Sequence, residues 1–374
     1  MKNVALYIHI PFCMQKCLYC DFPSFAGKEE HMLHYCAALA KEISSIKNKK
    51  IKTIFIGGGT PTYLSLEGWE IIKESIDRLD TTGGLEFTVE GNPGTFTMEK
   101  LEFFKKMGVN RLSIGLQAFQ DSLLKSLGRI HTVEDFKQSF EMARKLGFNN
   151  INVDLMFGLP SQTFSQWQET LKNVTELKPE HLSCYSLIVE EGTAFYKKFK
   201  QGTLNLPDEE IDRAMYHETI EYLSGKGYIQ YEISNFAKDK MACRHNLVYW
   251  EMEEYIGCGS ASHSYIDGFR YGNDENVEAY MEKINASGSA IVEKKKNSTK
   301  DDMEEFMFMG LRKIMGISKS QFQKRFNIDI HSVYEVVINK YTSNGFMVEN
   351  DDNIFLTYEG IEVSNVIMSE FLLS

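Results

Sequence analysis

The chain has 374 residues and a formal net charge of −11, and hydrophobic residues make up 43% of it. This length suits two or three domains, and this composition excludes a disordered chain. The acidic balance argues against a large nucleic-acid-binding surface, and no apolar run approaches the roughly 18 residues of a membrane-spanning helix.

The first 190 residues alternate short β-rich runs with amphipathic helical stretches. The apolar positions Trp69, Ile72, Ile76 and Leu79 recur at helical spacing, and Thr132 to Asp135 resembles a capping box. Alternation without hairpin signals predicts parallel strands joined by crossover helices, and six units favour a partial (β/α)6 TIM-like barrel of the α/β class over a closed eight-fold one. The predicted strands are Ala5–Ile10, Thr53–Ile56, Leu85–Glu90, Arg111–Gly115, Ile151–Met156 and His181–Leu187.

Polar and glycine-bearing clusters stand at the ends of these predicted strands. Turn chemistry alone is one explanation for each cluster. Together, however, they coincide with the C-terminal mouth of a barrel, where such folds carry their chemistry. The clusters are His9, Gly57–Thr60, Glu90–Asn92, Gln117 and Asp154.

The sequence divides the chain into three regions. Residues 1–237 are expected to form the partial barrel, 238–299 an irregular accessory region, and 300–374 a small C-terminal winged-helix-like domain of three helices, a hairpin and a final helix. The pattern is irregular from about 191 to 299, where Tyr231–Phe236 predicts a strand, and Glu293–Glu305 predicts a charged, exposed connector. The C-terminal domain carries 7 basic and 12 acidic residues, so we expect it to dock partners or pack rather than to bind DNA.

Three cysteines, Cys13, Cys17 and Cys20, follow the first predicted strand at CxxxCxxC spacing. The N-terminus lacks the pattern of a signal peptide, so we expect a cytoplasmic protein with reduced thiols. A zinc site with His9 as fourth ligand and a set of uncoordinated thiols are two alternatives. A [4Fe–4S] cluster normally takes four cysteines, so three leave one iron open to a further ligand.

The cysteine spacing resembles the signature of the radical SAM superfamily, whose members bind S-adenosylmethionine (SAM) at that open iron. The resemblance implies SAM contacts at the strand-end clusters. For Arg129 the alternative is an exposed charge on a loop. The positions that match the family's SAM contacts are Tyr7, Tyr19, Gly58, Gly59, Thr60, Glu90, Gln117, Arg129 and Asp154.

The resemblance extends through YIHIPFC, GGGTPTYL, SIGLQAF, LGRIHT and DLMFGLPSQ. This series is similar to the oxygen-independent coproporphyrinogen III dehydrogenases and to their paralogues, the radical SAM heme chaperone (HemW) family. Phe22 stands where the dehydrogenases carry a further cysteine, and twelve residues precede Cys13 where they carry a long arm. His245 begins HNLVYW, which matches the HNxxYW pattern of the chaperones.

His245 is the candidate heme contact, because a histidine can ligate heme iron and neighbouring aromatic side chains can pack on the macrocycle. A helix start with core aromatics is the alternative, and axial ligation is left open. Cys243 and His263 are weaker candidates, since lone cysteines are more often simply buried.

The resemblance therefore implies a heme chaperone that binds heme and delivers it to membrane respiratory apoproteins, with a [4Fe–4S] cluster and SAM as cofactors. Peripheral membrane contact, and a monomer or a cluster-dependent homodimer, are further family expectations; nucleic acid is not an expected partner. The alternative is a coproporphyrinogen III dehydrogenase that oxidatively decarboxylates propionates. A radical SAM enzyme acting on another substrate is a third interpretation, without a residue in its favour.

Overall fold

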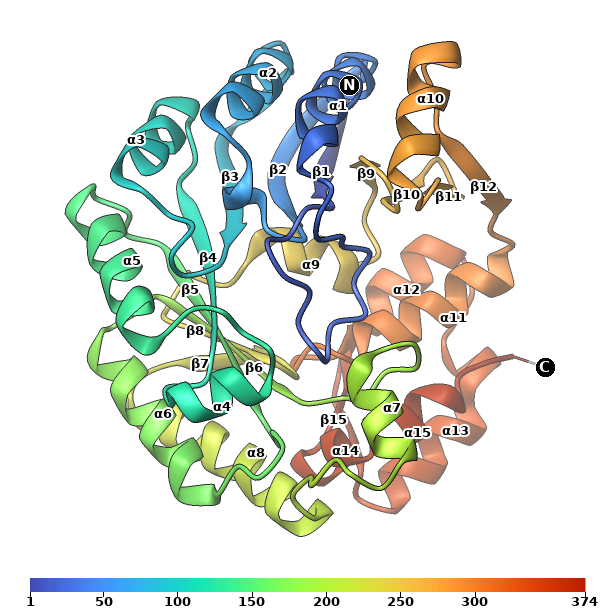
Figure 1. Ribbon diagram of the computed structural model, residues 1–374. Coiled ribbons are helices and arrows are strands. Elements are labelled where there is room, and N and C mark those ends of the chain that lie inside the picture. The colour runs from blue at the N-terminus through green and yellow to red at the C-terminus, as the bar shows by residue number, and fades with distance from the viewer. Residues whose placement is uncertain (374) are drawn as a thin grey trace.

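The computed structural model describes residues 1–373 and is organised around one curved sheet (Figure 1). Its 12 strands follow the order β12-β11-β10-β9-β1-β2-β3-β4-β5-β6-β8-β7. The series from β1 to β6 is parallel, which confirms the predicted partial barrel. These strands are β1 (Lys2–Ile10), β2 (Lys49–Gly58), β3 (Thr81–Gly91), β4 (Arg111–Gln117), β5 (Ile151–Phe157) and β6 (His181–Ser186).

Helices cover the outer face of the parallel strands, as Figure 1 shows. Trp69 and Trp167 are fully buried on this face, and Trp69 packs edge-on against Phe104 with ring centroids 4.7 Å apart. The capping box of Thr132 and Asp135 is present and begins α5. The elements are α1 (Met32–Ser44), α2 (Leu66–Ile76), α3 (Met98–Met107), α4 (Asp121–Ser126), α5 (Val133–Lys145) and α6 (Phe164–Glu176), with 3-10 turns at η1 (Glu29–His31) and η2 (Pro61–Tyr63).

Later segments extend the sheet at both edges. The strand β9 (Tyr255–Cys258) pairs in parallel with β1, so the region between 238 and 299 is more regular than expected. Beyond β9 lie β10 (His263–Ile266), β11 (Phe269–Asn273) and β12 (Ile291–Lys296), and β8 (Asn235–Ala237) and β7 (Ile229–Glu232) follow β6. The accompanying helices are α7 (Ala194–Lys200), α8 (Glu209–Gly225), α9 (Arg244–Trp250) and α10 (Val277–Ser287).

Two predictions for this region were wrong. The segment predicted as one strand over Tyr231–Phe236 contains a turn, because Glu232 accepts the Ser234 N–H at 3.2 Å and the chain reverses between β7 and β8. The expected connector over Glu293–Glu305 consists of the edge strand β12 and the start of α11 (Thr299–Gly310). The side chains of β12 are exposed, as expected, and β12 is an edge strand that pairs with β11.

The C-terminal part has the predicted order of helices and hairpin. After α11 come β13 (Ile317–Ser318), α12 (Lys319–Phe326), α13 (His331–Ser343), β14 (Met347–Glu349) and β15 (Asn353–Leu356). The expected final helix is two short ones, α14 (Tyr358–Glu362) and α15 (Ser364–Ser369). Phe322, Tyr334 and Phe371 pack into a separate hydrophobic cluster, which gives this part its own core.

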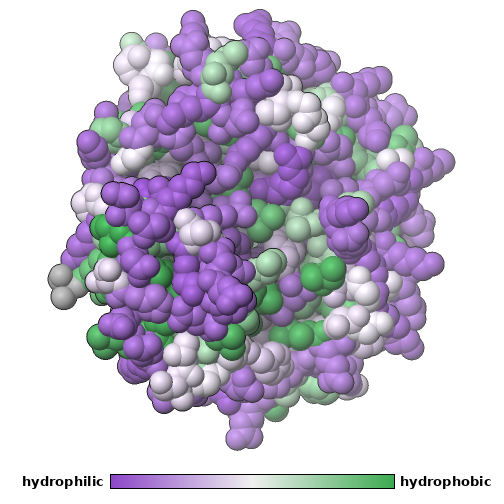
Figure 2. Space-filling view, turned by 180° about the vertical axis from the view of Figure 1, so that it is seen from behind, coloured by the Kyte–Doolittle hydropathy of each residue, from purple (hydrophilic) through white to green (hydrophobic). Residues whose placement is uncertain are grey.

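The surface seen from behind is mostly hydrophilic, and hydrophobic side chains gather toward its middle and lower part (Figure 2). Within residues 1–373 no helix has both the length and the apolar character to cross a membrane.

Candidate functional site

A closed loop from Pro11 to Phe25 carries the three cysteines at the C-terminal end of β1. The Cys13 N–H donates to the Phe25 carbonyl at 2.9 Å, and the Phe25 N–H donates to the Pro11 carbonyl at 2.7 Å. Cys13 is buried, whereas Cys17 and Cys20 are half-buried. The backbone therefore fixes both ends of the loop without help from the thiols.

The surroundings of Cys13 and Cys20 oppose the ionisation of their thiols. Burial raises the pKa of Cys13 and of Cys20, and the neighbouring Cys17 raises both further. A thiolate here needs a cation nearby, which iron supplies when it binds. Within residues 1–373 no three His, Cys, Asp or Glu side chains converge as ligands of a single ion. Three cysteines on one loop match the chemistry of a [4Fe–4S] cluster, in which their thiolates would hold three of the four irons.

His9 has no free nitrogen for a metal. Its Nε2 lies 2.8 Å from the Pro23 carbonyl oxygen, and its Nδ1 lies 3.0 Å from the Tyr7 hydroxyl. Burial lowers the pKa of His9 to about 4, so the ring is neutral at pH 7. His9 therefore ties the return limb of the cysteine loop to the barrel, and the zinc alternative loses its fourth ligand in this arrangement.

The turn Gly57–Thr60 lies directly against the cysteine loop. The Gly59 N–H donates to the Ile10 carbonyl and the Thr60 N–H to the Phe12 carbonyl, both at 2.8 Å. The Cys13 Sγ lies 3.4 Å from the Thr60 hydroxyl. The backbone approach depends on glycine, because a Cβ at Gly59 would lie 2.7 Å from the Phe12 carbonyl oxygen.

Substitution of Gly59 by alanine is expected to separate the glycine turn from the cysteine loop. Because the obstructing atoms are backbone, relief requires the chain to move, and we expect the free energy of unfolding to fall by about 1–3 kcal/mol. Urea unfolding measures this loss. Gly83→Ala is the matched control, since nothing lies within 4 Å of its Cβ. Equal effects at the two positions would contradict the close packing.

Arg129 lies beside two other predicted SAM contacts, Gln117 and Tyr19, rather than on an exposed loop. Its Nη1 donates to the Asn92 Oδ1 at 2.7 Å, and its buried Nε has no partner. A Cβ at Gly115 would lie 3.1 Å from both Arg129 Nη2 and Gln117 Nε2, which shows that these side chains converge. The Tyr19 hydroxyl also interacts with the Arg129 guanidinium. The unpartnered Nε is a donor available to a ligand.

Asn92 is the residue of this cluster that the SAM contacts predicted from sequence did not include. Its Nδ2 donates to the Thr60 hydroxyl at 2.8 Å, so Asn92 joins the glycine turn to Arg129. A small pocket is lined by Cys17, Thr60, Asn92 and Arg129 among others. Asn92 follows Glu90 closely at the end of a predicted strand, and this position was the signal that could have identified it.

Two carboxylates, Glu90 on β3 and Asp154 on β5, lie on the parallel strands of the barrel. Glu90 accepts the Gly58 N–H at 3.2 Å, and Asp154 accepts Asn152 Nδ2 at 2.7 Å and the Ser113 hydroxyl at 3.3 Å. Burial, followed by repulsion from Asp154, raises the pKa of Glu90 to about 8. Burial also raises the pKa of Asp154. A bound cation would favour the ionised form of both carboxylates. SAM carries a positive sulfonium and an amino group, so it fits this pair.

His245 does not lie with these residues. It is 1% exposed in α9, its Nδ1 lies 2.9 Å from the Thr53 hydroxyl, and its Nε2 lies 2.9 Å from the Tyr249 hydroxyl. Burial lowers the pKa of His245 to about 3. In this arrangement both ring nitrogens are engaged, so contact with heme iron requires α9 to move. Cys243 is buried beside His245, and His263 is exposed on β10.

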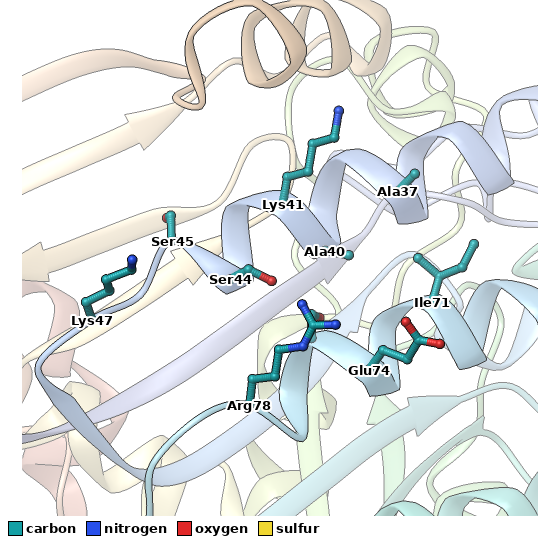
Figure 3. Close-up of a pocket in the computed structure, with 10 residues that line it drawn as sticks. Ala37, Ala40, Lys41, Ser44, Ser45, Lys47, Ile71, Glu74 and Arg78 are labelled. Atoms are coloured by element: carbon teal, nitrogen blue, oxygen red, sulfur yellow. The ribbon is translucent and has the colours of Figure 1, made fainter.

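A second hollow lies on the outside of the barrel, between the ends of α1 and α2 (Figure 3). Its floor is formed by small side chains such as Ala40 and Ser44, and Lys41 and Arg78 stand at its rim. None of the predicted site residues lines it. The chemistry-bearing residues therefore gather at the barrel mouth and not in this hollow.

Comparison with known proteins agrees with this geometry. The Radical SAM superfamily matches residues 7–174, and the HemN C-terminal domain matches residues 297–363. In overall structure the chain is similar to the protein described as "Coproporphyrinogen III oxidase (HemN) from Escherichia coli is a Radical SAM enzyme", with a TM-score of 0.86 and 22% identity over 99% of this chain and 90% of that one. That likeness shows a shared fold.

Similar sequences identify the family more narrowly. The heme chaperone HemW of Bacillus subtilis is 40% identical, over 98% of this chain and 99% of the relative. The heme chaperone HemW of Lactococcus lactis is 36% identical, over 100% of this chain and 98% of the relative. With such identity along its length, and with the cysteine loop, glycine turn and carboxylates assembled at one barrel mouth, the chain belongs to the HemW family of the radical SAM superfamily.

Proposed function

We propose that this protein is a heme chaperone that binds heme and delivers it to membrane respiratory apoproteins. The observation that carries the proposal is the 40% identity to the heme chaperone HemW of Bacillus subtilis over 98% of the chain. The mouth of the barrel supports it, because Cys17 lines a pocket together with Thr60, Asn92 and Arg129.

Each residue at the mouth has a distinct part in this proposal. Cys13, Cys17 and Cys20 hold a [4Fe–4S] cluster, which supplies one-electron chemistry and an open iron when bound. The Arg129 Nε and the Gln117 amide offer hydrogen-bond donors, and Glu90 and Asp154 offer negative charge to the sulfonium and amino groups of SAM. Gly58, Gly59, Thr60, Tyr7 and Tyr19 complete the proposed SAM site.

Phe22 favours the chaperone over the dehydrogenase. Phe22 stands at the sequence position where the dehydrogenases carry a further cysteine. Its side chain is 62% exposed on the cysteine loop.

The dehydrogenase is the second candidate, because the structure resembles HemN so closely along its length. Incubation of the anaerobically reconstituted protein with coproporphyrinogen III, SAM and a strong reductant tests it, beside a genuine dehydrogenase as positive control. We expect no protoporphyrinogen IX. Multiple-turnover formation of this product would overturn the chaperone proposal.

The proposed localisation, membrane contact and oligomeric state come from the resemblance to the family. We propose a cytoplasmic protein with peripheral membrane contact, as a monomer or a cluster-dependent homodimer. We also propose three parts, with the barrel over 1–237, an accessory region over 238–299 and a docking domain over 300–374.

The proposed heme contact of His245 has a direct test. His245→Ala is expected to weaken heme binding while the cluster absorption is retained, and heme titration followed in the Soret band measures it. Tyr265→Phe is a control, because its hydroxyl bonds Asp302 in the C-terminal part and not α9. Unchanged heme affinity in His245→Ala would remove this role.

A further inference from the structure

Polar side chains of β5 and β6 lie together next to Asp154. Asn152 shares a face of β5 with Asp154, because side chains two residues apart along a strand point the same way. In the register with β6, Asn152 lies opposite His181 and Asp154 lies opposite Ser183. Asn152 is 2% exposed and His181 is fully buried, so each must find its hydrogen-bond partners within the protein.

The Asn152 amide makes all four hydrogen bonds that an amide group can make. Its Nδ2 donates to Asp154 Oδ1 at 2.7 Å and to the Ser113 hydroxyl at 2.8 Å. Its Oδ1 accepts from the Ser183 hydroxyl at 3.1 Å and lies 2.6 Å from His181 Nδ1. This orientation suits an ionised Asp154, since the reversed amide would place an oxygen against the carboxylate.

The orientation of the amide determines which nitrogen of His181 carries the proton. Because Asn152 Oδ1 is an acceptor, His181 Nδ1 must be the donor. Burial holds the pKa of His181 well below its usual range, so the ring is neutral and Nε2 carries no proton. Nε2 therefore accepts the hydroxyl of Tyr231 on β7, 2.8 Å away. The Tyr231 oxygen in turn accepts the Cys243 N–H at 3.3 Å, at the start of α9.

We propose that Asn152 and His181 are positioning residues of the SAM site: His181 locks the Asn152 amide, and the amide holds the Asp154 carboxylate in place for the positive groups of SAM. This inference rests on the proposed SAM site at Asp154. Without a donor at His181 Nδ1 the amide can turn, and its oxygen then repels an ionised Asp154. The carboxylate no longer offers a fixed negative charge, so SAM binds more weakly.

Three substitutions of His181 separate the parts of its two nitrogens. His181→Leu removes both, and we expect the affinity for SAM to fall about tenfold. His181→Asn restores a donor close to the position of Nδ1, so it should recover most of the affinity. His181→Gln places its amide close to the position of Nε2, near Tyr231, and should bind SAM as weakly as His181→Leu. Equilibrium dialysis of SAM against the reconstituted proteins measures the four affinities.

The tautomer of His181 is a readout that a merely structural role would not move. Nitrogen NMR of protein labelled at its histidine rings distinguishes a protonated Nδ1 from a protonated Nε2, and the signal absent from His181→Asn belongs to His181. At pH 7 we expect a protonated Nδ1 and an unprotonated Nε2 in the wild type.

Tyr231→Phe tests the same chain of hydrogen bonds from its other end. It removes the donor to Nε2, so we expect part of the His181 rings to protonate at Nε2 and the affinity for SAM to fall about threefold. Tyr228→Phe is the matched control, because the buried Tyr228 hydroxyl donates to the Pro179 carbonyl at 2.7 Å and not to this chain. It should leave the His181 signal and the affinity for SAM unchanged.

The outcomes separate the proposal from its premise. A protonated Nε2 in the wild type would overturn the chain of hydrogen bonds. Wild-type affinity in a folded His181→Leu would overturn the positioning role, and so would an equal loss in His181→Leu and His181→Asn, which would assign the effect to packing. Absence of SAM binding to the wild type overturns the proposed SAM site, whereas the NMR signal still tests the chain. If His181→Leu fails to fold by circular dichroism, equal affinities in Tyr231→Phe and Tyr228→Phe would contradict the proposal.

Discussion

Exchange of Cys13, Cys17 and Cys20 for alanine is expected to leave a folded chain without iron. The loop that carries them is fixed by backbone bonds, including Leu18 N–H to the Leu127 carbonyl at 3.0 Å and Phe195 N–H to the Leu18 carbonyl at 2.9 Å. These bonds do not involve the thiols. Iron should therefore fall from about four atoms per chain to background, with circular dichroism unchanged.

Iron analysis and visible absorption after anaerobic reconstitution measure this effect. Cys36→Ala is the matched control, because Cys36 is a fully buried thiol in α1, away from the loop. It should retain iron and lose only a little stability. Wild-type iron in the triple variant would refute the cluster assignment, and zinc in place of iron would restore the zinc alternative.

The affinity for SAM is expected to rise with pH, because the site must ionise before it binds a cation. With a pKa of about 8, Glu90 is mostly protonated at pH 7. A bound cation favours the ionised carboxylate, so binding releases a proton, and below pH 8 the affinity should fall by up to about tenfold per pH unit. Isothermal titration between pH 6.5 and 9 in buffers of different ionisation enthalpy reports the affinity and the proton together.

Glu90→Gln is expected to bind SAM weakly and with little dependence on pH. The same substitution should stabilise the ligand-free protein at high pH. A carboxyl whose folded pKa is raised binds more protons in the folded than in the unfolded state, so its contribution to stability falls between its ordinary pKa and about pH 8. A pH profile of the variant that matches the wild type would assign the titration to another group, such as Asp154.

The parallel barrel was predictable because its signals are local. Runs such as Ile151–Met156 alternate with helical stripes, and the capping box at Thr132 marks a helix start by sequence alone. The hairpin between β7 and β8 was missed because its turn, at Ile233 and Ser234, contains no glycine or proline. Its geometry is set by the Glu232 side chain, which no turn rule describes.

The mouth of the barrel was predicted from strand ends and from the family motifs, whereas the surroundings of His245 in α9 were not. A polar residue such as Glu86 or Arg111 in the first half of a strand gives no indication of whether it faces solvent or the barrel interior. The burial of His245 could not be inferred for the same reason, since its partners Thr53 and Tyr249 lie on different elements.

Heme transfer tests the central claim most directly. The reconstituted protein is loaded with one equivalent of hemin, separated from free hemin, and incubated with membranes from heme-starved cells, with free hemin at the same concentration as reference. We predict saturable heme binding and a recovery of respiratory oxidase activity that exceeds the recovery with free hemin. Absence of saturable binding, or recovery no greater than with free hemin, would contradict the assignment as a heme chaperone.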